Sequence, residues 1–195
     1  MAVAWCALHS LLIAPPVERR LRRWLGRRAA WYRLLYNLVS LATLLAAWAF
    51  FRAHPGRPLW RWHGAWQAVR AAGWLYFLVI GWAGSRAHDG AAFVGVRQIR
   101  QGNDAATGDA FTRAGILGRM RHPWYAAGLV FLVVYRDVTT TDLVWRGVFF
   151  LYLLVGARLE ERKLRRRFGE AYAAYCREVP AFFPRLRSAR GAGDR

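Results

Sequence analysis

The residues best suited to do chemistry gather in the short stretch 115–125, whose sequence is GILGRMRHPWY. Pro123 suits the first position of a helix, because an N–H there would have no helical partner. A helix that begins at Pro123 presents free backbone N–H groups and the positive end of its dipole beside Arg121 and His122. This arrangement predicts a binding site for an anionic group such as a carboxylate.

Two carboxylates, Glu160 and Glu161, could meet these groups from a later part of the chain. The two intervening apolar segments are joined by a short polar stretch, so a helical hairpin would return Glu160 to the level of His122. A cationic helix start, the ring of Tyr125 and opposing carboxylates fit the carboxylate, sulfonium and ribose of S-adenosylmethionine. The residues alone predict a site for a polar ligand, at what the topology described below makes the cytoplasmic interface of a membrane. Another anionic ligand or a nucleotide would fit the same residues.

Structural roles would account for the same side chains. His122, directly before a proline, would then only cap the helix. Glu160 and Glu161 stand among arginines, and Glu161 is spaced to pair with Arg165 one helical turn later. Of the two carboxylates, Glu161 is therefore expected to be the structural one.

The elements that position these residues belong to a chain that is both basic and apolar. Of its 195 residues, 30 are Lys or Arg and 11 are Asp or Glu, which gives a formal net charge of +19, yet 56% are hydrophobic. This apolar content excludes a disordered polycation. The 11 Trp and 11 Phe exceed what a small soluble core hides, so a membrane protein is favoured. Cys6 and Cys176 lie too far apart to indicate a disulfide framework or a zinc site.

Nucleic-acid binding is excluded as the reason for the basic charge. A sequence pI of about 11.5 would fit phosphate contacts, but the sequence has no zinc-finger spacing, RNA-binding strand motif or helix-turn-helix pattern. The arginines instead flank apolar segments, where membrane topology explains them. The sequence also contains no Walker loop, HExxH motif or Ser-His-Asp order.

An all-α fold with about five membrane-spanning helices is predicted. The surest span contains LLYNLVSLATLLAAWAFF, an uncharged run between Arg33 and Arg52 that is long enough to cross the hydrocarbon layer. Within other spans, Arg70 needs a partner helix or an interface. His9 and Asn37 are interpreted as packing hydrogen bonds. The predicted spans are 1–14, 33–52, 66–85, 123–136 and 143–158.

Arginines also orient these helices. Seven of them lie from Arg19 to Arg33, between the first two spans, so the positive-inside rule makes this connection cytoplasmic. The N-terminus is then outside and the C-terminus inside, and the ligand site faces the cytoplasm. The loop 54–62 carries fewer basic charges on the predicted outer face. Arg136 and Arg146 are expected to extend to that same interface.

A basic amphipathic helix is predicted to continue from the last span along the cytoplasmic membrane surface. Apolar side chains recur every three to four residues from Leu159 to Val179, and arginines cover the opposite face. Such a helix suits a surface of anionic lipids. Pro180 and Pro184 end it, and 188–195 is expected to be a loose tail.

The motifs together resemble those of a known superfamily. RHPWY at 121–125 is followed by EERKLRRRFGEAYAAY at 160–175 and by VP at 179–180. Over about residues 111–184, this order resembles the signature of the isoprenylcysteine carboxyl methyltransferase superfamily of integral-membrane enzymes. Upstream, HS at 9–10, YRLLYN at 32–37 and DGAAFVGVRQ at 89–98 resemble the bacterial methanethiol S-methyltransferase branch and the related NnrU-type membrane proteins.

This resemblance implies an S-adenosylmethionine pocket formed by the cytoplasmic portions 93–125 and 156–184. The stretch 111–117 would pass beside the adenosine, and the residues at 122–125 would line the pocket. The side chains that the resemblance assigns to the cofactor are Gln98, Phe111, Leu117, His122, Pro123, Trp124, Tyr125, Glu160 and Glu161.

The resemblance also bears on the methyl acceptor. In eukaryotic isoprenylcysteine enzymes, an arginine one helical turn before the cofactor glutamate contacts the substrate carboxylate, whereas Gly156 stands here. We therefore expect methyl transfer to a small thiol such as methanethiol, by an in-line displacement that needs no metal. Arg121 and Arg97 are the candidates for lowering the pKa of that thiol.

Several alternatives stay open at this point. Within the same class, the acceptor would be an isoprenylcysteine carboxylate or another lipid-borne group. Outside it, the chain would be a non-catalytic NnrU-type accessory protein of nitrogen-oxide metabolism, or a basic scaffold on the membrane surface. The combination of His122 and Glu160 favours an enzyme, and the oligomeric state is left open.

Overall fold

The computed structural model describes residues 1–101 and 111–184, and most of these are helical. The helices are α1 (Ala2–Ile13), α2 (Pro15–Leu25), η1 (Gly26–Trp31), α3 (Tyr32–Ala53), α4 (Trp66–Arg86), α5 (Gly90–Val94), α6 (Val96–Gln101), η2 (Gly115–Gly118), α7 (Pro123–Val134) and α8 (Thr140–Glu178). Two short strands, β1 (Pro58–Trp60) and β2 (Val138–Thr139), form an antiparallel pair. The predicted all-α class is confirmed apart from these strands. The predicted loose tail 188–195 lies outside the described residues.

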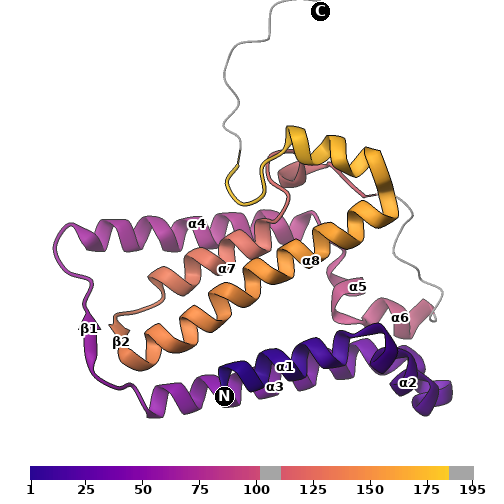
Figure 1. The fold of residues 1–195 in the computed structure, drawn as a ribbon, viewed down its shortest axis with the longest axis horizontal. Coiled ribbons are helices and arrows are strands. Elements are labelled where there is room, and N and C mark those ends of the chain that lie inside the picture. Colours follow the sequence, from indigo (N-terminus) through magenta and orange to yellow (C-terminus); the bar gives the residue numbers. More distant parts are fainter. Residues whose placement is uncertain (102–110, 185–195) are drawn as a thin grey trace, which may run out of the picture.

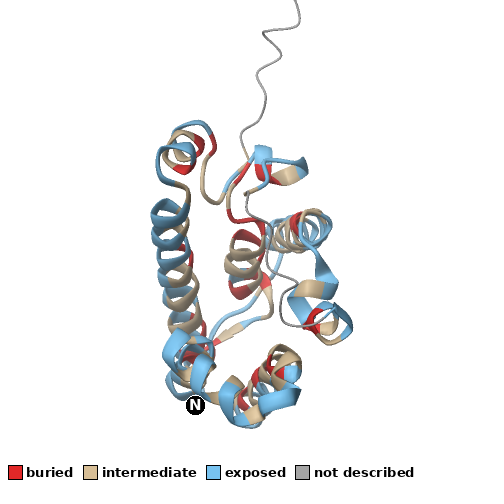
Figure 2. Ribbon diagram, turned by 90° about the vertical axis from the view of Figure 1, so that its right-hand side faces the viewer, coloured by how far each residue is buried: buried red, intermediate tan, exposed pale blue. Residues whose placement is uncertain are grey.

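The long helices form an elongated bundle (Figure 1). α7 packs against both α4 and α8, and α1 packs against α3 and α8. Figure 2 shows buried residues on the faces where helices meet and exposed residues over the outer faces. Those outer faces carry large apolar side chains, such as Leu41 and Leu45 on α3, Leu75 and Trp82 on α4, and Leu151 on α8. Apolar outer faces on a helix bundle suit contact with lipid chains.

Helices occupy all five segments that were predicted to span a membrane. α3 and α4 coincide closely with the predicted spans 33–52 and 66–85. By length and hydropathy, one helical run among the described residues, Pro15–Ala53, is able to cross a membrane, and α1 and α7 are shorter apolar helices. The count of five spans and their direction stay predictions.

Two loops predicted to lie outside the membrane meet at one end of the bundle, where β1 pairs with β2 (Figure 1). The N–H of Thr140, at the start of α8, also donates to the carbonyl of Arg57 at 2.9 Å. The sequence does not predict this pair, because each strand is very short and its partner lies far away along the chain. The strands tie the α3–α4 connection to the α7–α8 hairpin.

The prediction that Arg146 extends to the membrane interface is wrong. Its side chain is buried, and its guanidinium donates to the carbonyls of Arg136 and Asp137 at 3.1 Å each. It also faces the carboxylate of Asp142 at 3.7 Å. Carbonyls at the end of a helix lack helical partners and need donors. An inward guanidinium at this position supplies them.

The last helix differs from the predicted amphipathic helix along the membrane surface. Gly169 has φ 55° and ψ −131°, a left-handed conformation that favours glycine, and α8 turns sharply there (Figure 1). The residues after it fold back, so that Tyr172, Tyr175 and Val179 are buried in a cluster with Phe111. Apolar side chains whose periodicity indicated a membrane surface therefore form a small protein core.

Candidate functional site

The site is built on the start of α7. Pro123 is the first helical residue, as predicted, and His122 precedes it. The N–H groups of Arg121 and His122 donate to the carbonyls of Pro180 and Ala181, at 2.9 Å each. The segment after α8 therefore fixes this helix start, and no side chain in the described part of the chain caps it. Because first-turn N–H groups lack helical partners, the start of α7 suits an anionic group.

His122 lies between the two glutamates of α8, with only 4% of its side chain exposed. Its Nε2 is 3.1 Å from Glu161 Oε1, and its Nδ1 is 3.9 Å from Glu160 Oε2. The ring of Tyr125 meets the imidazole edge-on, with centroids 5.3 Å apart. The structure thus brings His122 and Glu160 together, as the predicted hairpin requires.

Arg121 and Glu161 form an ion pair on the buried side of this cluster, and Glu161 also contacts His122. A guanidinium nitrogen of Arg121 lies 2.7 Å from Glu161 Oε1, and both side chains are largely covered. Arg121 also donates to the carbonyls of Cys176, at 2.9 Å, and Val179. Burial raises the pKa of Glu161, but hydrogen bonds from Arg121 and His122 outweigh burial, so this pKa lies below its ordinary value. The carboxylate of Glu161 is therefore ionised when it binds the imidazole of His122.

Glu160 faces the open side of the same cluster. Its side chain is 48% exposed, and its carboxylate lies close enough to the hydroxyl of Tyr125 to interact with it. Gly156 leaves room for this contact, since a Cβ there would lie 3.1 Å from the Tyr125 ring. Glu161, in contrast, also pairs with Arg165 at 3.8 Å, as its spacing predicts. Of the two glutamates, Glu160 is the one whose carboxylate is available to a ligand.

An aromatic wall lies beside the start of α7. Phe111 packs against Phe168, Tyr172 and Tyr175, with ring centroids between 5.2 and 5.5 Å apart. Leu117 is buried, and its carbonyl accepts a hydrogen bond of 2.6 Å from the Tyr175 hydroxyl. Both candidates from the 111–117 stretch therefore rest on the C-terminal segment that also holds the start of α7.

Trp124 and Gln98 belong to the side of the bundle formed by α4, α5 and α6. Trp124 stacks on His88, with centroids 4.6 Å apart, and meets Phe93 edge-on at 4.8 Å. Gln98 is buried, and its Nε2 donates to the carbonyl of Ala92 at 3.1 Å. Its Oε1 is buried without a hydrogen-bond partner among the described residues. Gln98 is therefore linked to Trp124 through α5.

Arg97 is engaged elsewhere. Its guanidinium pairs with Asp89, and its Nε donates to Gln101 Oε1 at 3.0 Å. Asp89 also accepts from the N–H of Ala92 at 3.0 Å, and this bond together with Arg97 holds the pKa of the carboxyl below its usual range. Arg97 thus ties α5 to α6, and Arg121 is the predicted catalytic arginine that lies in the cluster around His122.

Sequence reasoning missed a polar cluster formed by α1, α3 and α8. The ring of His9 lies with its Nε2 2.9 Å from the Tyr36 hydroxyl and its Nδ1 3.2 Å from Ser40 Oγ. The hydroxyls of Ser10 and Tyr152 are 3.0 Å apart, and the rings of His9 and Tyr152 meet edge-on. The predicted packing role of His9 describes its bond to α3, yet the cluster joins three helices.

The cluster around His9 adjoins the site through Tyr125. Tyr125 lies within electrostatic range of Tyr152 and Tyr36 on one side and of Glu160 on the other. An ionisable side chain inside a predicted span marks a functional site by default. That signal at His9 was available in the sequence, but the partners from α3 and α8 were not.

The whole chain can be compared with known proteins. A family model described as NnrU protein matches residues 1–185. The chain belongs to the NnrU family. Its motifs agree with this membership, since they resemble the NnrU branch of the isoprenylcysteine methyltransferase superfamily. No solved structure matches this NnrU-family protein significantly.

Several curated relatives of this NnrU-family protein are named for one reaction. Methanethiol S-methyltransferase 2 of Bradyrhizobium diazoefficiens is 29% identical over 191 residues, which cover 96% of this chain and 72% of that protein. Methanethiol S-methyltransferase of Pseudomonas deceptionensis is 35% identical over 75 residues, which cover 38% of this chain and 29% of that protein. The first similarity extends over nearly the whole chain, so it includes both the α7 start and the α1 region.

Proposed function

We propose that this NnrU-family protein is an integral-membrane methyltransferase that uses S-adenosylmethionine to methylate a small thiol. The observation that carries the proposal is the half-exposed Glu160, which lies beside Tyr125 and the buried His122 at the start of α7. An open carboxylate, an aromatic ring and a helix start meet at this point. The names of the methanethiol S-methyltransferase relatives support the same chemistry.

The residues present fit S-adenosylmethionine. Its carboxylate suits the N–H groups at the start of α7, its ribose hydroxyls suit Glu160, and its sulfonium suits the ring of Tyr125. The aromatic cluster at Phe111 and the Oε1 of Gln98, which lacks a hydrogen-bond partner within residues 1–101 and 111–184, are available to the adenosine. When bound, the cofactor supplies an electrophilic methyl group. Arg121 and Glu161 act as positioning residues, because they hold His122 and the C-terminal segment in place.

The acceptor thiol is proposed to lie at the cluster around His9. Transfer of the methyl group from a bound S-adenosylmethionine would break its methyl–sulfonium bond, leave S-adenosylhomocysteine and form a C–S bond on the acceptor. The acceptor S–H bond must break as well, so one proton has to leave the acceptor sulfur. The thiolate, and not the thiol, is the effective nucleophile. The imidazole of His9 accepts this proton, and its hydrogen bonds to Tyr36 and Ser40 orient the ring. In this proposal His9 activates the thiol in place of Arg121 and Arg97, the two arginines that the sequence suggested for lowering the pKa of the thiol.

A small acceptor suits the space beside the site. The ring of Tyr125 lies against the backbone at Gly156, where the prenylcysteine enzymes place their carboxylate-binding arginine. A longer side chain at Gly156 would displace that ring. We therefore propose methanethiol or a similarly small, neutral thiol, which can enter through the apolar outer faces of the bundle.

The same arrangement underlies the proposed location. The arginine-rich α2 and the start of α7 lie at the same end of the bundle (Figure 1). The positive-inside rule places that end in the cytoplasm, next to the anionic lipids of a bacterial inner membrane. Soluble S-adenosylmethionine can reach a site on this side.

The proposal is tested by incubating detergent-purified protein with S-adenosylmethionine and methanethiol and measuring dimethyl sulfide by gas chromatography. We expect product from the wild type and at least about tenfold less from Glu160→Gln, since a hydrogen bond to a charged group contributes about 1.5–3 kcal/mol. Glu170→Gln is the matched control, because Glu170 is exposed and pairs with Arg177. A folded wild type without methyl transfer to methanethiol or to a prenylcysteine would contradict the proposal and favour the accessory role.

A further inference from the structure

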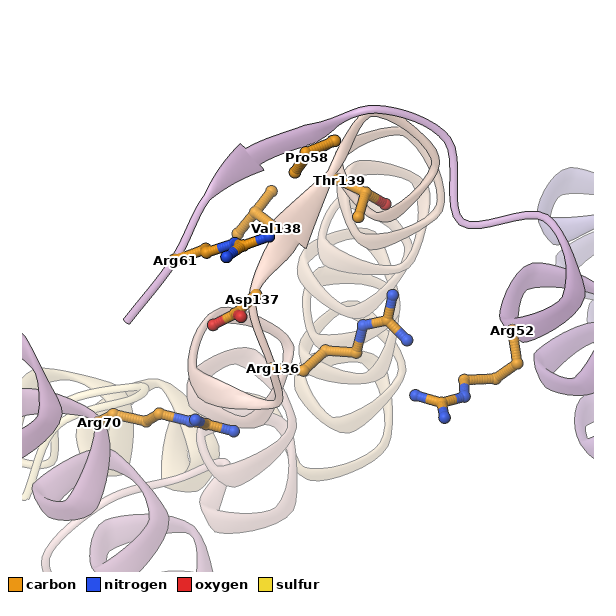
Figure 3. A pocket seen from close by; sticks show the side chains of 8 residues that line it. All are labelled: Arg52, Pro58, Arg61, Arg70, Arg136, Asp137, Val138 and Thr139. Atoms are coloured by element: carbon orange, nitrogen blue, oxygen red, sulfur yellow. The ribbon is translucent and has the colours of Figure 1, made fainter. Parts of the chain in front are cut away.

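A second polar site lies at the opposite end of the bundle, beside the β1–β2 pair. A cavity of about 330 Å³ opens there between the ends of α3, α4 and α7. Figure 3 shows the side chains of Arg52, Arg61, Arg70 and Arg136 around it, together with Asp137. The α3–α4 region, with Arg52, Arg61 and Arg70, and the distant end of α7, with Arg136, therefore bring four guanidinium groups to one cavity.

The charges around this cavity do not balance. Arg136 pairs with Asp142 at 3.1 Å, and Asp142 also faces the buried Arg146 at 3.7 Å. The four lining arginines and Arg146 thus stand against two carboxylates, Asp137 and Asp142, which leaves an excess of three positive charges. Like charges this close repel one another unless an anion lies between them.

Part of this arginine cavity is preorganised. Arg70 donates from Nε to the carbonyl of Val134 and from its terminal nitrogen to the carbonyl of Tyr135, at 3.2 Å each. These bonds confirm that Arg70 lies against a partner helix, α7. Arg136 is held by its ion pair with Asp142. Arg52 and Arg61 have no ion-pair partner in the part of the chain that the structure describes. Two fixed guanidiniums and two that lack an ion-pair partner among the described residues thus line the same cavity, and that of Arg52 also lies over the Trp48 ring, 5.8 Å from its centroid.

The chemistry of this site points to a phosphate. Guanidinium groups bind phosphate oxygens with paired, charge-assisted hydrogen bonds. The cavity volume is at the lower end of the range of about 300–1,000 Å³ that holds small organic ligands, so a phosphate with a glycerol-sized substituent fits. Trp60 and Trp66 lie on the adjoining elements, and tryptophan is typical of the headgroup level of a bilayer.

We propose that this arginine cavity binds a phosphate-bearing ligand, for which the headgroup of an anionic phospholipid is the source favoured by its place at the end of the bundle. A bound phosphate would also explain why the loop 54–62 keeps basic charge on the predicted outer face. The proposal is independent of the methyltransferase function, because the cavity lies at the opposite end from the start of α7.

The test is a titration of delipidated, detergent-purified protein followed by native mass spectrometry. The probes are dioctanoyl-phosphatidylglycerol, its zwitterionic phosphatidylcholine counterpart and soluble glycerol 3-phosphate. We expect phosphatidylglycerol to bind in preference to phosphatidylcholine. Arg52→Gln/Arg61→Gln should weaken that binding at least about tenfold, given about 1.5–3 kcal/mol for each charged hydrogen bond.

Arg27→Gln/Arg28→Gln is the matched control, since it removes the same charge from exposed positions of η1, at the other end of the bundle. Unchanged melting temperatures establish that both variants fold. Glycerol 3-phosphate binding that is lost in Arg52→Gln/Arg61→Gln would support the phosphate site and assign it to a soluble ligand. Equal phosphatidylglycerol binding by the wild type and Arg52→Gln/Arg61→Gln, or equal weakening in the control, would overturn the proposal.

Discussion

At each end of the bundle, a carboxylate lies among basic side chains. The carboxylate at the end that carries β1 and β2, which belongs to Asp142, is almost completely enclosed. There, the side chain of Asp142 is 5% exposed and lies 3.1 Å from Arg136 and 3.7 Å from Arg146. It also accepts hydrogen bonds from Thr139 and from the indole of Trp145, at distances of 2.8 to 3.1 Å. Its oxygens are saturated by groups that hold α7, β2 and α8 together.

The end at the start of α7 is closed only in part. Glu161 is enclosed by Arg121 and His122, much as Asp142 is at the far end. The adjacent Glu160 remains half exposed beside Tyr125. The oxygens of the enclosed carboxylate are already occupied by Arg121 and His122, so the proposed ligand site is assigned to the open neighbour Glu160. Variants that separate stability from ligand binding test this difference.

The largest effect is expected on stability, from Asp142→Asn. The change removes the partner of two covered guanidinium groups, and breaking a buried ion pair costs about 3–5 kcal/mol. Denaturant unfolding of the detergent-solubilised protein, followed by circular dichroism, measures the loss. Asp89→Asn is the control, because its pair with Arg97 is exposed and Asn still caps α5. Equal losses in both variants would contradict the structural role of Asp142.

A large loss of turnover with little loss of stability is expected from His9→Gln. A side chain that accepts a proton in the reaction contributes about 10²–10⁴-fold to the rate. Binding of S-adenosylhomocysteine should stay unchanged, and part of the lost rate should return at high pH, where more of the free thiol is ionised. Thr43→Val, which removes from α3 a hydroxyl that bonds only to backbone carbonyls of its own helix, is the control. Weakened ligand binding with unchanged turnover would instead make His9 a packing residue.

Cofactor affinity is expected to fall in Glu160→Gln between roughly tenfold and a hundredfold, which corresponds to about 1.5–3 kcal/mol for a hydrogen bond to a charged group. Its unfolding free energy should match the wild type, because Glu160 is exposed. Calorimetric titration with S-adenosylhomocysteine and denaturant unfolding of the same samples provide both numbers. The reverse pattern, with stability lost and affinity kept, would assign Glu160 to the fold.

The contribution of Glu161 to the free energy of unfolding is expected to depend on pH. Its pKa is lower in the folded protein than its ordinary value, so its stabilising contribution is complete at neutral pH and disappears as the pH falls through the folded pKa. Wild type and Glu161→Gln should therefore differ in unfolding free energy at neutral pH and converge below the ordinary glutamate pKa of about 4.3. A pH-independent difference between the two proteins would show that the ion pair is not its cause.

The smallest effect is expected from Gly156→Ala. The added Cβ would lie 3.1 Å from the Tyr125 ring, which must move by a few tenths of an ångström. We expect the KM for the thiol to rise by about fivefold, since overpacking of this size costs about 1 kcal/mol. Gly147→Ala on the same helix has open space around it and should leave KM unchanged. A lower KM in Gly156→Ala would show that Tyr125 restricts the acceptor site in the wild type.

Local sequence patterns identified most of the helices and the centre of the site. Apolar runs located α3 and α4, and the RHP and EE motifs located His122 and Glu160, because these signals depend on neighbouring residues. The sequence pattern does not predict the sharp turn at Gly169, because the three- to four-residue spacing of apolar side chains continues through it unchanged. The β1–β2 pair and the inward turn of Arg146 depend on contacts between distant segments, which no local pattern encodes.

The site was incompletely predicted for the same reason. Glu161 and Arg165 pair as their helical spacing requires, and Glu161 is the carboxylate that is enclosed by ion pairs. His9 gains its position only because α1 packs against both α3 and α8, which brings it to Tyr36 and Tyr152. Which helices become neighbours is decided by the fold as a whole.

The central claim is that the half-open cluster at the start of α7 binds S-adenosylmethionine. The most direct measurement is calorimetric binding of S-adenosylhomocysteine to the purified wild type, His122→Ala, Glu160→Ala and the control Glu170→Gln. The account predicts binding by the wild type and the control and its loss in both site variants, with Glu160→Ala fully folded. Absence of binding by the folded wild type, or equal binding by Glu160→Ala, would contradict it.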